Sequence, residues 1–287
     1  MQGNAFLGSD LAAECAVCEG SGIRIRRSSA QGCEITHVRV ESAQAAERIG
    51  KPQGRYVTVD CGNVCELDEQ EEQRVARVLS VEIRELSQKM CARRVGNDFF
   101  VLVVGLGNAE MTPDSLGPKT LKTLPVTRRF RGEVGEIGAF SRCDLAALAP
   151  GVMAQTGLDT VQILRGVVES VRPDLVIAVD ALAARSPARL AATVQLSDSG
   201  IQPGGGIGNA RRALTRESVG VPVMALGVPT VINCATLLND LMGKQMPMDQ
   251  ESIERARALF VCPKEIDLLV GRAAALLGKA ISRAFCI

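Results

Sequence analysis

Two apolar, β-branched stretches stand out in the hydrophobic pattern of the chain, one at 98–106 and one at 175–181. Continuous apolar runs of this length are typical of strands that are buried on both faces of a sheet. Each run leads to an aspartate among small residues, Asp114 after the first run and Asp180 near the end of the second. Because ligands bind beyond the carboxyl ends of strands in open α/β sheets, we expect these two carboxylates to meet in one site.

The remaining periodicity predicts that strands alternate with helices along the chain. Alternating apolar and polar residues predict a hairpin at 22–40 and further strands at 54–60, 132–140, 192–196 and 221–226. Apolar residues at helical spacing predict helices at 68–90, 157–171, 234–242 and 263–284. This alternation favours an α/β fold, a three-layer α/β/α sandwich around a mostly parallel sheet. No linker or repeat divides the chain, so we expect a single α/β domain over residues 9–287.

The composition is that of an ordinary globular protein. Hydrophobic residues make up 46% of the chain and charged residues 23%, and the formal net charge of +1 gives no electrostatic reason to expect a nucleic-acid or membrane partner. The apolar runs fall short of the roughly 20 residues that a membrane-spanning helix needs. The first residues have no basic segment that leads into an apolar one, so we expect no secretory signal and a cytoplasmic protein.

Metal-binding and nucleophilic side chains are sparse. Of the ten cysteines only Cys15 and Cys18 form a C-x-x-C pair, and a zinc site of this type needs a second pair, so we expect no metal site. His37 is the only histidine, and its alternating surroundings are explained by a half-exposed strand. A Ser-His-Asp triad, an H-E-x-x-H zinc site or a Cys-His dyad would each require it. Hydrolysis by this chain is therefore expected to depend on carboxylates.

The sequence GLGN after the first buried run resembles a dinucleotide-binding loop but does not complete the pattern. The third glycine or alanine of that pattern would stand at Glu110. The next residues are typical of a helix start instead, with Thr112 as the cap and Pro113 in the first turn. Two interpretations stay open for each aspartate. Asp114 and Asp180 either stabilise a helix start and a turn or perform catalysis.

A glycine-rich loop at 197–209 follows the strand expected at 192–196. Glycines allow the backbone to approach a ligand closely, and long loops of this kind are more often functional than not. The loop lacks the G-K-[ST] ending of a phosphate-binding loop. Together with the helix start at Thr112, its backbone is our candidate for binding substrate and stabilising an oxyanion, through Gly204, Gly205, Gly206, Gly208 and Asn209.

Six motifs, in this order along the chain, resemble the germination protease (spore protease) family of endospore-forming bacteria. They are GLGNAEMTPDSLGP, PGVMAQTGLDT, VIAVDALAAR, QLSDSGIQPGGGIGN, PVMALGVPTVIN and CPKEIDLL. The resemblance extends from about Ser9 to the C-terminal helix. Several long motifs in the right order are a much more specific signal than any single motif.

The resemblance implies a cytoplasmic endopeptidase of the spore core that degrades small acid-soluble spore proteins during germination. It also implies a homotetramer, made as a zymogen that removes a short N-terminal propeptide by self-cleavage, and residues 1–8 are the expected propeptide arm. The implied fold is similar to that of the hydrogenase-maturation endopeptidases. The two essential aspartates of the family fall on Asp114 and Asp180, the same residues that the strand pattern indicates.

A carboxylate pair of this kind can activate water without a metal or another cofactor, so none is expected. The two carboxyl groups would share one proton, because two close carboxylates cannot both ionise cheaply. Two alternatives stay open. A metal-dependent maturation endopeptidase of the same fold would bind a divalent metal through the same carboxylates, but it would be expected to add a histidine ligand, and His37 is remote in sequence. A binding scaffold without turnover is the second alternative, against which the intact Asp114 and Asp180 argue.

Overall fold

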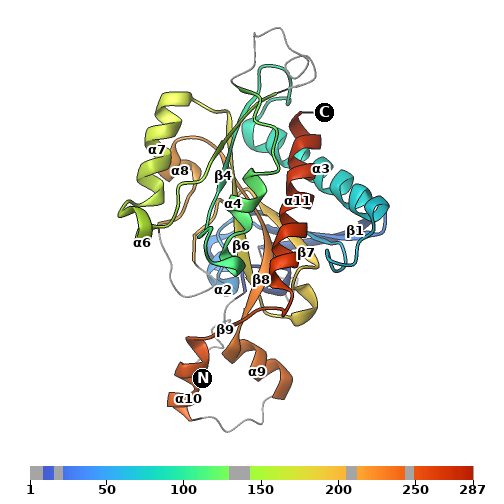
Figure 1. Cartoon of the computed structure of the whole chain (residues 1–287), viewed down its shortest axis with the longest axis vertical. Helices are drawn as coiled ribbons and strands as arrows, with labels where there is room; N and C mark the ends of the chain where they lie inside the picture. The colour runs from blue at the N-terminus through green and yellow to red at the C-terminus, as the bar shows by residue number, and fades with distance from the viewer. Residues whose placement is uncertain (1–8, 16–21, 129–142, 205–211, 243–248, 287) are drawn as a thin grey trace.

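A computed structural model describes residues 9–15, 22–128, 143–204, 212–242 and 249–286 of the chain. The described strands form one sheet, in the order β1-β2-β3-β7-β8-β6-β4-β5, and the short strand β9 pairs with the far end of β8. Helices lie on both faces of this sheet, and one pair of helices projects from the body of the molecule (Figure 1). The α/β class expected from the sequence is therefore what the structure shows.

One half of the sheet is antiparallel. It consists of β1 (Ile23–Ala30), β2 (Cys33–Val40), β3 (Gly54–Asp60) and β7 (Thr193–Ser197). Gln31 and Gly32 join β1 to β2, and both have a positive φ, of 49° and 85°, which suits the tight turn of a hairpin. The hairpin at 22–40 and the strand at 54–60 are confirmed.

The other half of the sheet is parallel. It consists of β8 (Val223–Asn233), β6 (Leu175–Ala184), β4 (Phe100–Gly105) and β5 (Asp144–Leu148). β8 meets β7 in antiparallel orientation, so the sheet is mixed and the expectation of a mostly parallel sheet is wrong. The reason is connectivity: a tight turn and a short helical connection join β1, β2 and β3, and parallel neighbours need long crossovers.

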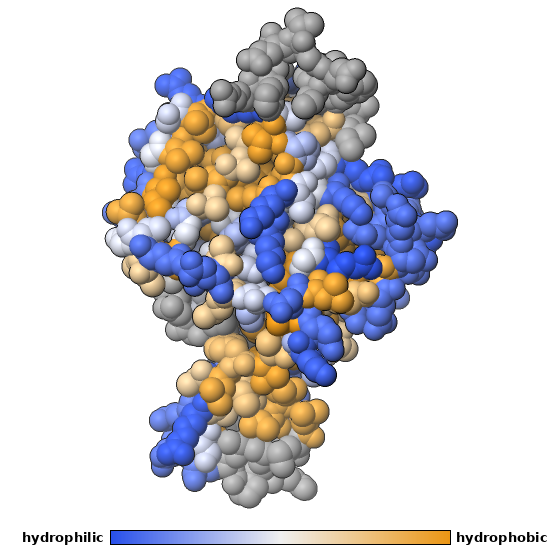
Figure 2. Space-filling model, in the orientation of Figure 1, coloured by the Kyte–Doolittle hydropathy of each residue, from blue (hydrophilic) through white to orange (hydrophobic). Residues whose placement is uncertain are grey.

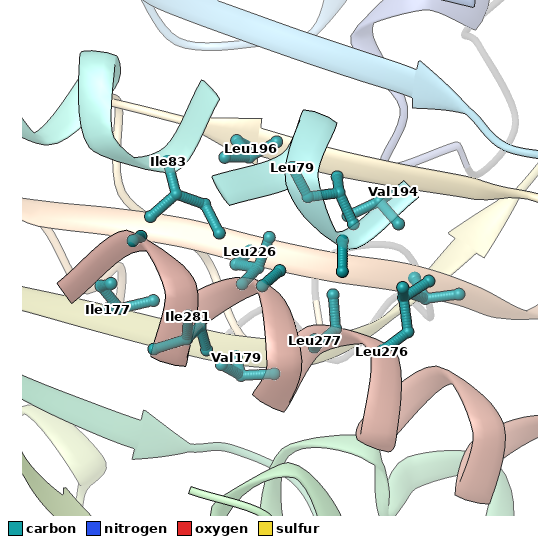
Figure 3. Close-up of a cluster of buried hydrophobic side chains, with 14 of the residues drawn as sticks. Leu79, Ile83, Ile177, Val179, Val194, Leu196, Leu226, Leu276, Leu277 and Ile281 are labelled. Carbon is teal, nitrogen blue, oxygen red and sulfur yellow. The ribbon is translucent and has the colours of Figure 1, made fainter. Parts of the chain in front are cut away.

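Two long helices, α3 (Glu69–Cys91) and α11 (Ile266–Phe285), cover one face of the sheet. α3 begins at a capping box in which Asp68 accepts a hydrogen bond from the Glu71 amide and Glu71 accepts one from the Asp68 amide. Its apolar side pairs with α11 and packs on the strands, as Figure 3 shows for Leu79, Ile83, Ile177 and other buried residues. This face carries the largest described core, and the helices expected at 68–90 and 263–284 are confirmed.

The opposite face of the parallel strands is covered by α7 (Thr160–Val171) and α8 (Arg216–Val219). Leu102 and Val104 of β4 point to this side, whereas Val101 and Val103 point to α3 and α11, as the alternation of a strand requires. On the antiparallel strands, the same role falls to α1 (Ala12–Cys15) and α2 (Ala43–Ile49). The central strands are thus buried on both faces, whereas most residues of the edge strand β1 are exposed.

The helices α9 (Cys234–Met242) and α10 (Gln250–Arg257) form the projection at the bottom of Figure 1. α10 leads into β9 (Phe260–Val261), which pairs with the end of β8. Apolar side chains gather on the visible face of this projection (Figure 2). Leu241 of α9 and Leu259, which precedes β9, are among the most exposed of the large hydrophobic residues. None of the helices in the described part of the chain is long and apolar enough to cross a membrane.

Several element boundaries differ from the sequence-based expectation. The helix expected at 157–171 begins only at Thr160, because Asp159 caps it by accepting a hydrogen bond from the Val161 amide, and the short helix α6 (Met153–Thr156) precedes it. The strand expected at 221–226 continues to Asn233. β5 and α2 were not expected, and the strand predicted at 132–140 lies outside the described residues.

Candidate active site

Asp114 lies just beyond the carboxyl end of β4, in a turn of 3₁₀ helix η1 (Thr112–Asp114) that leads into α4 (Leu116–Leu121). Its carboxylate oxygen Oδ2 accepts a hydrogen bond of 2.7 Å from the backbone amide of Asn108. Gly107 permits this approach, since its φ is +100° and any Cβ there would overlap the backbone oxygen of Asp114. The loop between β4 and η1 therefore folds back over the aspartate.

Thr112 does not act as the expected cap. It is the first residue of η1, the preceding Met111 occupies the cap position, and no side chain caps this turn. The carbonyl of Thr112 instead accepts hydrogen bonds from both the amide and the hydroxyl of Ser115. A cap must have extended backbone geometry, and here the turn has already closed at Thr112.

Backbone packing holds this turn against the sheet. Gly117, in the first turn of α4, lies so close to the strand ends that an added Cβ would stand 2.6 Å from the carbonyl oxygen of Val179 in β6. Gly105, the last residue of β4, is equally close to the backbone of Gly117. Because neither position has a side chain, the segment that carries Asp114 sits directly on β4 and β6.

Asp180 follows Val179 in β6 and is a buried acid, with 6% of its surface exposed. Its Oδ1 accepts a hydrogen bond of 2.9 Å from the amide of Ala181. In the parallel register Gly105 pairs with Val179, so Asp180 stands one residue beyond the end of β4. On its other side it pairs with Gly227 of β8, where an added Cβ would lie 2.6 Å from the Asp180 carbonyl oxygen.

Asp114 and Asp180 line the same cavity, of about 260 Å³, at the carboxyl ends of the parallel strands; we call this cavity the aspartate pocket. Most of the other side chains that line it are apolar, among them Leu106, Met111, Val152, Leu182, Ile201, Val231 and Phe260. A carboxyl group in such a space can act as an acid or a base toward a bound molecule. The structure thus brings together the two residues that the sequence singled out.

A third carboxylate, that of Asp10, also lines the aspartate pocket. Its amide donates a hydrogen bond of 2.8 Å to the carbonyl of Ala183, and its Oδ2 accepts one of 2.8 Å from the Ala183 amide. Burial raises the pKa of Asp10 above its usual value, while the Lys51 ammonium and the Ala183 amide act in the opposite direction. The hydrophobic pattern does not indicate Asp10 as a site residue, because Asp10 precedes the first periodic segment.

The segment 9–15, which contains Asp10, is fixed both by polar contacts and by burial of Leu11, which packs with Leu182 and Ile232. The carboxylate of Glu14 accepts hydrogen bonds from the amides of Arg185 and Ser186, of 2.8 and 2.9 Å, and Arg189 Nε lies 3.6 Å from it. The side chain of Gln195 accepts a hydrogen bond from the Ala12 amide and donates one to the Asp10 carbonyl. These contacts dock the segment across the ends of β6 and β7, beside the aspartate pocket.

Only the start of the expected glycine loop falls within the described residues. Gln202, Pro203 and Gly204 line the aspartate pocket, so this end of the loop is at the site. The other oxyanion candidates, Gly205, Gly206, Gly208 and Asn209, lie outside the described residues.

A second, larger cavity of about 950 Å³ adjoins the aspartate pocket and shares Asp10, Leu182, Ile201 and Gln202 with it. Its lining is more polar and comes from α2, β3, β7, α8 and the loop after β7, with Lys51, Tyr56, Asp198 and Arg216 among its residues.

In the described part of the chain, no three His, Cys, Asp or Glu side chains are grouped as metal ligands. No disulfide joins the nine described cysteines. Cys15 is buried, which raises its pKa, and Cys18 lies outside the described residues. His37 is on β2, 4.0 Å from Glu82 of α3, and burial lowers its pKa. It does not line either cavity.

Comparison with known proteins shows the family of the chain. Residues 9–248 match the family model of the germination proteases, a peptidase family. A germination protease of Caldanaerobacter subterraneus subsp. tengcongensis is 38% identical over 92% of this chain and 88% of its own length. Those of Clostridium acetobutylicum and Priestia megaterium are each 40% identical over 77% of this chain, and the matches span 66% and 59% of their own lengths. The chain belongs to the germination protease family.

Proposed function

We propose that this chain is an endopeptidase that degrades small acid-soluble spore proteins during spore germination, with Asp114 and Asp180 activating water. The observation that carries the proposal is that Asp114 of η1 and Asp180 of β6 line one restricted and largely apolar pocket. Membership of the germination protease family supports the peptidase activity and its place in germination. The larger cavity that adjoins this pocket provides additional room for a polypeptide substrate.

In this mechanism the two carboxyl groups share one proton across a water molecule. The ionised carboxylate takes a proton from the water as it attacks the scissile carbonyl carbon, and the protonated group donates its proton to the leaving amine. The pair then titrates jointly rather than as two independent acids. Gly204 lines the pocket, so backbone amides at this end of the glycine loop are candidates to stabilise the developing oxyanion.

Zymogen control is part of the proposal, with residues 1–8 as the propeptide arm that the chain removes by self-cleavage. Support comes from the segment that follows the arm. Asp10 lies in the aspartate pocket and Glu14 is anchored beside it, so the arm is attached to the chain at the entrance of the site. An arm attached there can block access to Asp114 and Asp180, and its removal would open the pocket.

The remaining parts of the proposal concern the setting of the enzyme. We expect a homotetramer in the cytoplasm of the spore core, with no direct nucleic-acid or membrane partner. We also expect a three-layer α/β/α sandwich similar to the hydrogenase-maturation endopeptidases, which the helices on both faces of the sheet support. A protease that acts in germination has proteins as substrates, and we expect this site to bind and cleave them.

The test is mass spectrometry of a purified small acid-soluble spore protein after incubation with the chain. Asp180→Asn is run in parallel, with and without a chelator, and Asp267→Asn, an exposed acid of α11, is the matched control. We expect discrete cleavage by the wild type and by the control, loss of at least about a hundredfold in the Asp180 variant, and no effect of the chelator.

Cleavage that survives Asp180→Asn would remove Asp180 from the mechanism. Cleavage that the chelator abolishes would favour the metal-dependent maturation endopeptidase. A wild type that cleaves nothing, even after removal of residues 1–8, would favour a binding scaffold.

A further inference from the structure

Strand β8 touches both halves of the proposed catalytic pair. Gly227 pairs with Asp180 in the parallel register and lies against its backbone without a side chain between them. Three residues later, the hydroxyl of Thr230 donates a hydrogen bond of 2.8 Å to the carbonyl of Pro113, inside the turn that carries Asp114. The same short stretch of one strand therefore contacts the supports of both aspartates.

The position of Thr230 results from an irregularity in the sheet. Leu182 of β6 pairs with Pro229, but the next residue, Ala183, pairs with Val231, so Thr230 is an extra residue in β8. Pro229 has no amide hydrogen and cannot donate a hydrogen bond to the neighbouring strand. Prolines within sheets are therefore often found at bulges. Bulges redirect a side chain out of the regular alternation and are common beside active sites.

The Thr230 side chain is fully buried, with 0% of its surface exposed, and it borders the aspartate pocket. The hydrogen bond it makes reaches an element 117 residues away in the sequence. If the Thr230 hydroxyl were removed, the Pro113 carbonyl would lose this donor. Loss of a buried hydrogen-bond partner costs more free energy than loss of an exposed one. The contact is therefore specific and hard to replace by water.

We infer that Thr230 is a positioning residue, which fixes the turn Thr112–Asp114 on β8 and so sets the Asp114 carboxylate opposite Asp180. The inference rests on the proposed function, in which these two carboxylates are the reacting groups. Thr230 itself takes no part in proton transfer. It acts through the carbonyl of Pro113, the residue before Asp114, and Gly227 supplies the matching contact on the Asp180 side.

The test compares Thr230→Val, which removes the hydroxyl and keeps the branched shape, with Thr230→Ser, which keeps the hydroxyl. Thr127→Val is the matched control, because Thr127 is also buried but does not line the aspartate pocket. The Thr127 hydroxyl donates a hydrogen bond of 3.1 Å to the Cys143 carbonyl and accepts one of 3.0 Å from the Leu145 amide. The first measurement is amide hydrogen exchange of the full chain over residues 108–116, which needs no substrate. The second is kcat and KM for cleavage of a purified small acid-soluble spore protein.

We expect Thr230→Val to speed the exchange of the Asp114 and Ser115 amides at least about tenfold and to lower kcat by about 10- to 100-fold, with KM within about twofold of wild type. Thr230→Ser should restore both readouts, and Thr127→Val should change neither. Wild-type exchange and kcat in Thr230→Val would overturn the inference, as would a loss that the serine variant does not restore or that the control shares. Thr230→Ala takes the place of the valine variant where that variant does not fold.

Asp114→Asn separates this inference from the proposed function. If that variant keeps cleaving, the carboxylate mechanism is wrong. The catalytic role assigned to Thr230 is then also wrong, even if hydrogen exchange shows that its hydroxyl fixes the turn. If Asp114→Asn is inactive and Thr230→Val cleaves like the wild type, the mechanism stands and the positioning role is refuted.

Discussion

Replacing Glu14 by glutamine tests whether the N-terminal segment is held at the site by its charge. The Glu14 side chain is 7% exposed, and its two oxygens accept hydrogen bonds from the consecutive amides of Arg185 and Ser186. The guanidinium of Arg189 adds an ion pair at 3.6 Å. Glutamine has nearly the same shape, but it has no charge and offers one N–H group where an acceptor is needed.

The expected loss follows from these contacts. A hydrogen bond to a charged group contributes about 1.5–3 kcal/mol and a neutral one about 0.5–1.5 kcal/mol, and one of the two acceptor positions is lost outright. Allowing for partial rearrangement, the docking of segment 9–15 should weaken by about 3 kcal/mol. Since each 1.4 kcal/mol is a factor of ten, the undocked population should rise about a hundredfold.

Hydrogen exchange of the amides at 11–15 measures this population directly. The Ala12 amide is the best reporter, because it donates a hydrogen bond of 2.7 Å to Gln195 across the segment. Glu251→Gln is the control, as Glu251 pairs with Arg255 on the surface of α10 and has no contact with the segment. Exchange at 11–15 that stays at the wild-type rate in Glu14→Gln would show that the carboxylate does not hold the segment.

Two further predictions concern the packing and ionisation of the fold. Gly117→Ala should lower the melting temperature by about 5 °C or more in calorimetry. The added Cβ would stand 2.6 Å from the Val179 carbonyl oxygen, and overpacking of this kind costs about 1–3 kcal/mol. An unchanged melting temperature would mean that α4 can move away from the sheet. Tyr56 is the single tyrosine of the chain, and burial raises its pKa to about 12, against the smaller opposing effect of the Ser199 hydroxyl. The absorbance of Tyr56 should therefore titrate near pH 12 in the folded protein and near pH 10 in denaturant. Because the pKa of this acid is higher in the folded state than in the unfolded state, the folded state should lose stability as the pH rises above 10. A midpoint near pH 10 in the folded protein would contradict the burial of Tyr56.

The sequence predicted best where one physical signal dominates. β4 and β6 are buried on both faces, so their continuous apolar runs stand out, and the rule that ligands bind beyond the carboxyl ends of such strands placed Asp114 and Asp180 at the same edge. The long helix α3 was equally clear, because its apolar spacing and its capping residues agree.

The features that escaped prediction depend on contacts between distant parts of the chain. Asp10 has no periodic neighbours, and it reaches the pocket only because Ala183, far along the chain, pairs with it. Thr230 looks like an ordinary strand residue, and the bulge that turns it toward Pro113 follows from its pairing with β6. The mixed sheet was missed for the same reason, since strand direction is set by connections and partners rather than by the residues of one strand.

The glycines around the aspartate pocket have an evolutionary consequence. Gly105, Gly107, Gly117 and Gly227 each stand where backbone meets backbone, so no other residue fits without displacing a strand or a turn. The exposed leucines of the projection, Leu241 and Leu259, have no such constraint. We therefore expect substitutions within the family to accumulate at the projection, while the backbone packing around the two aspartates stays fixed.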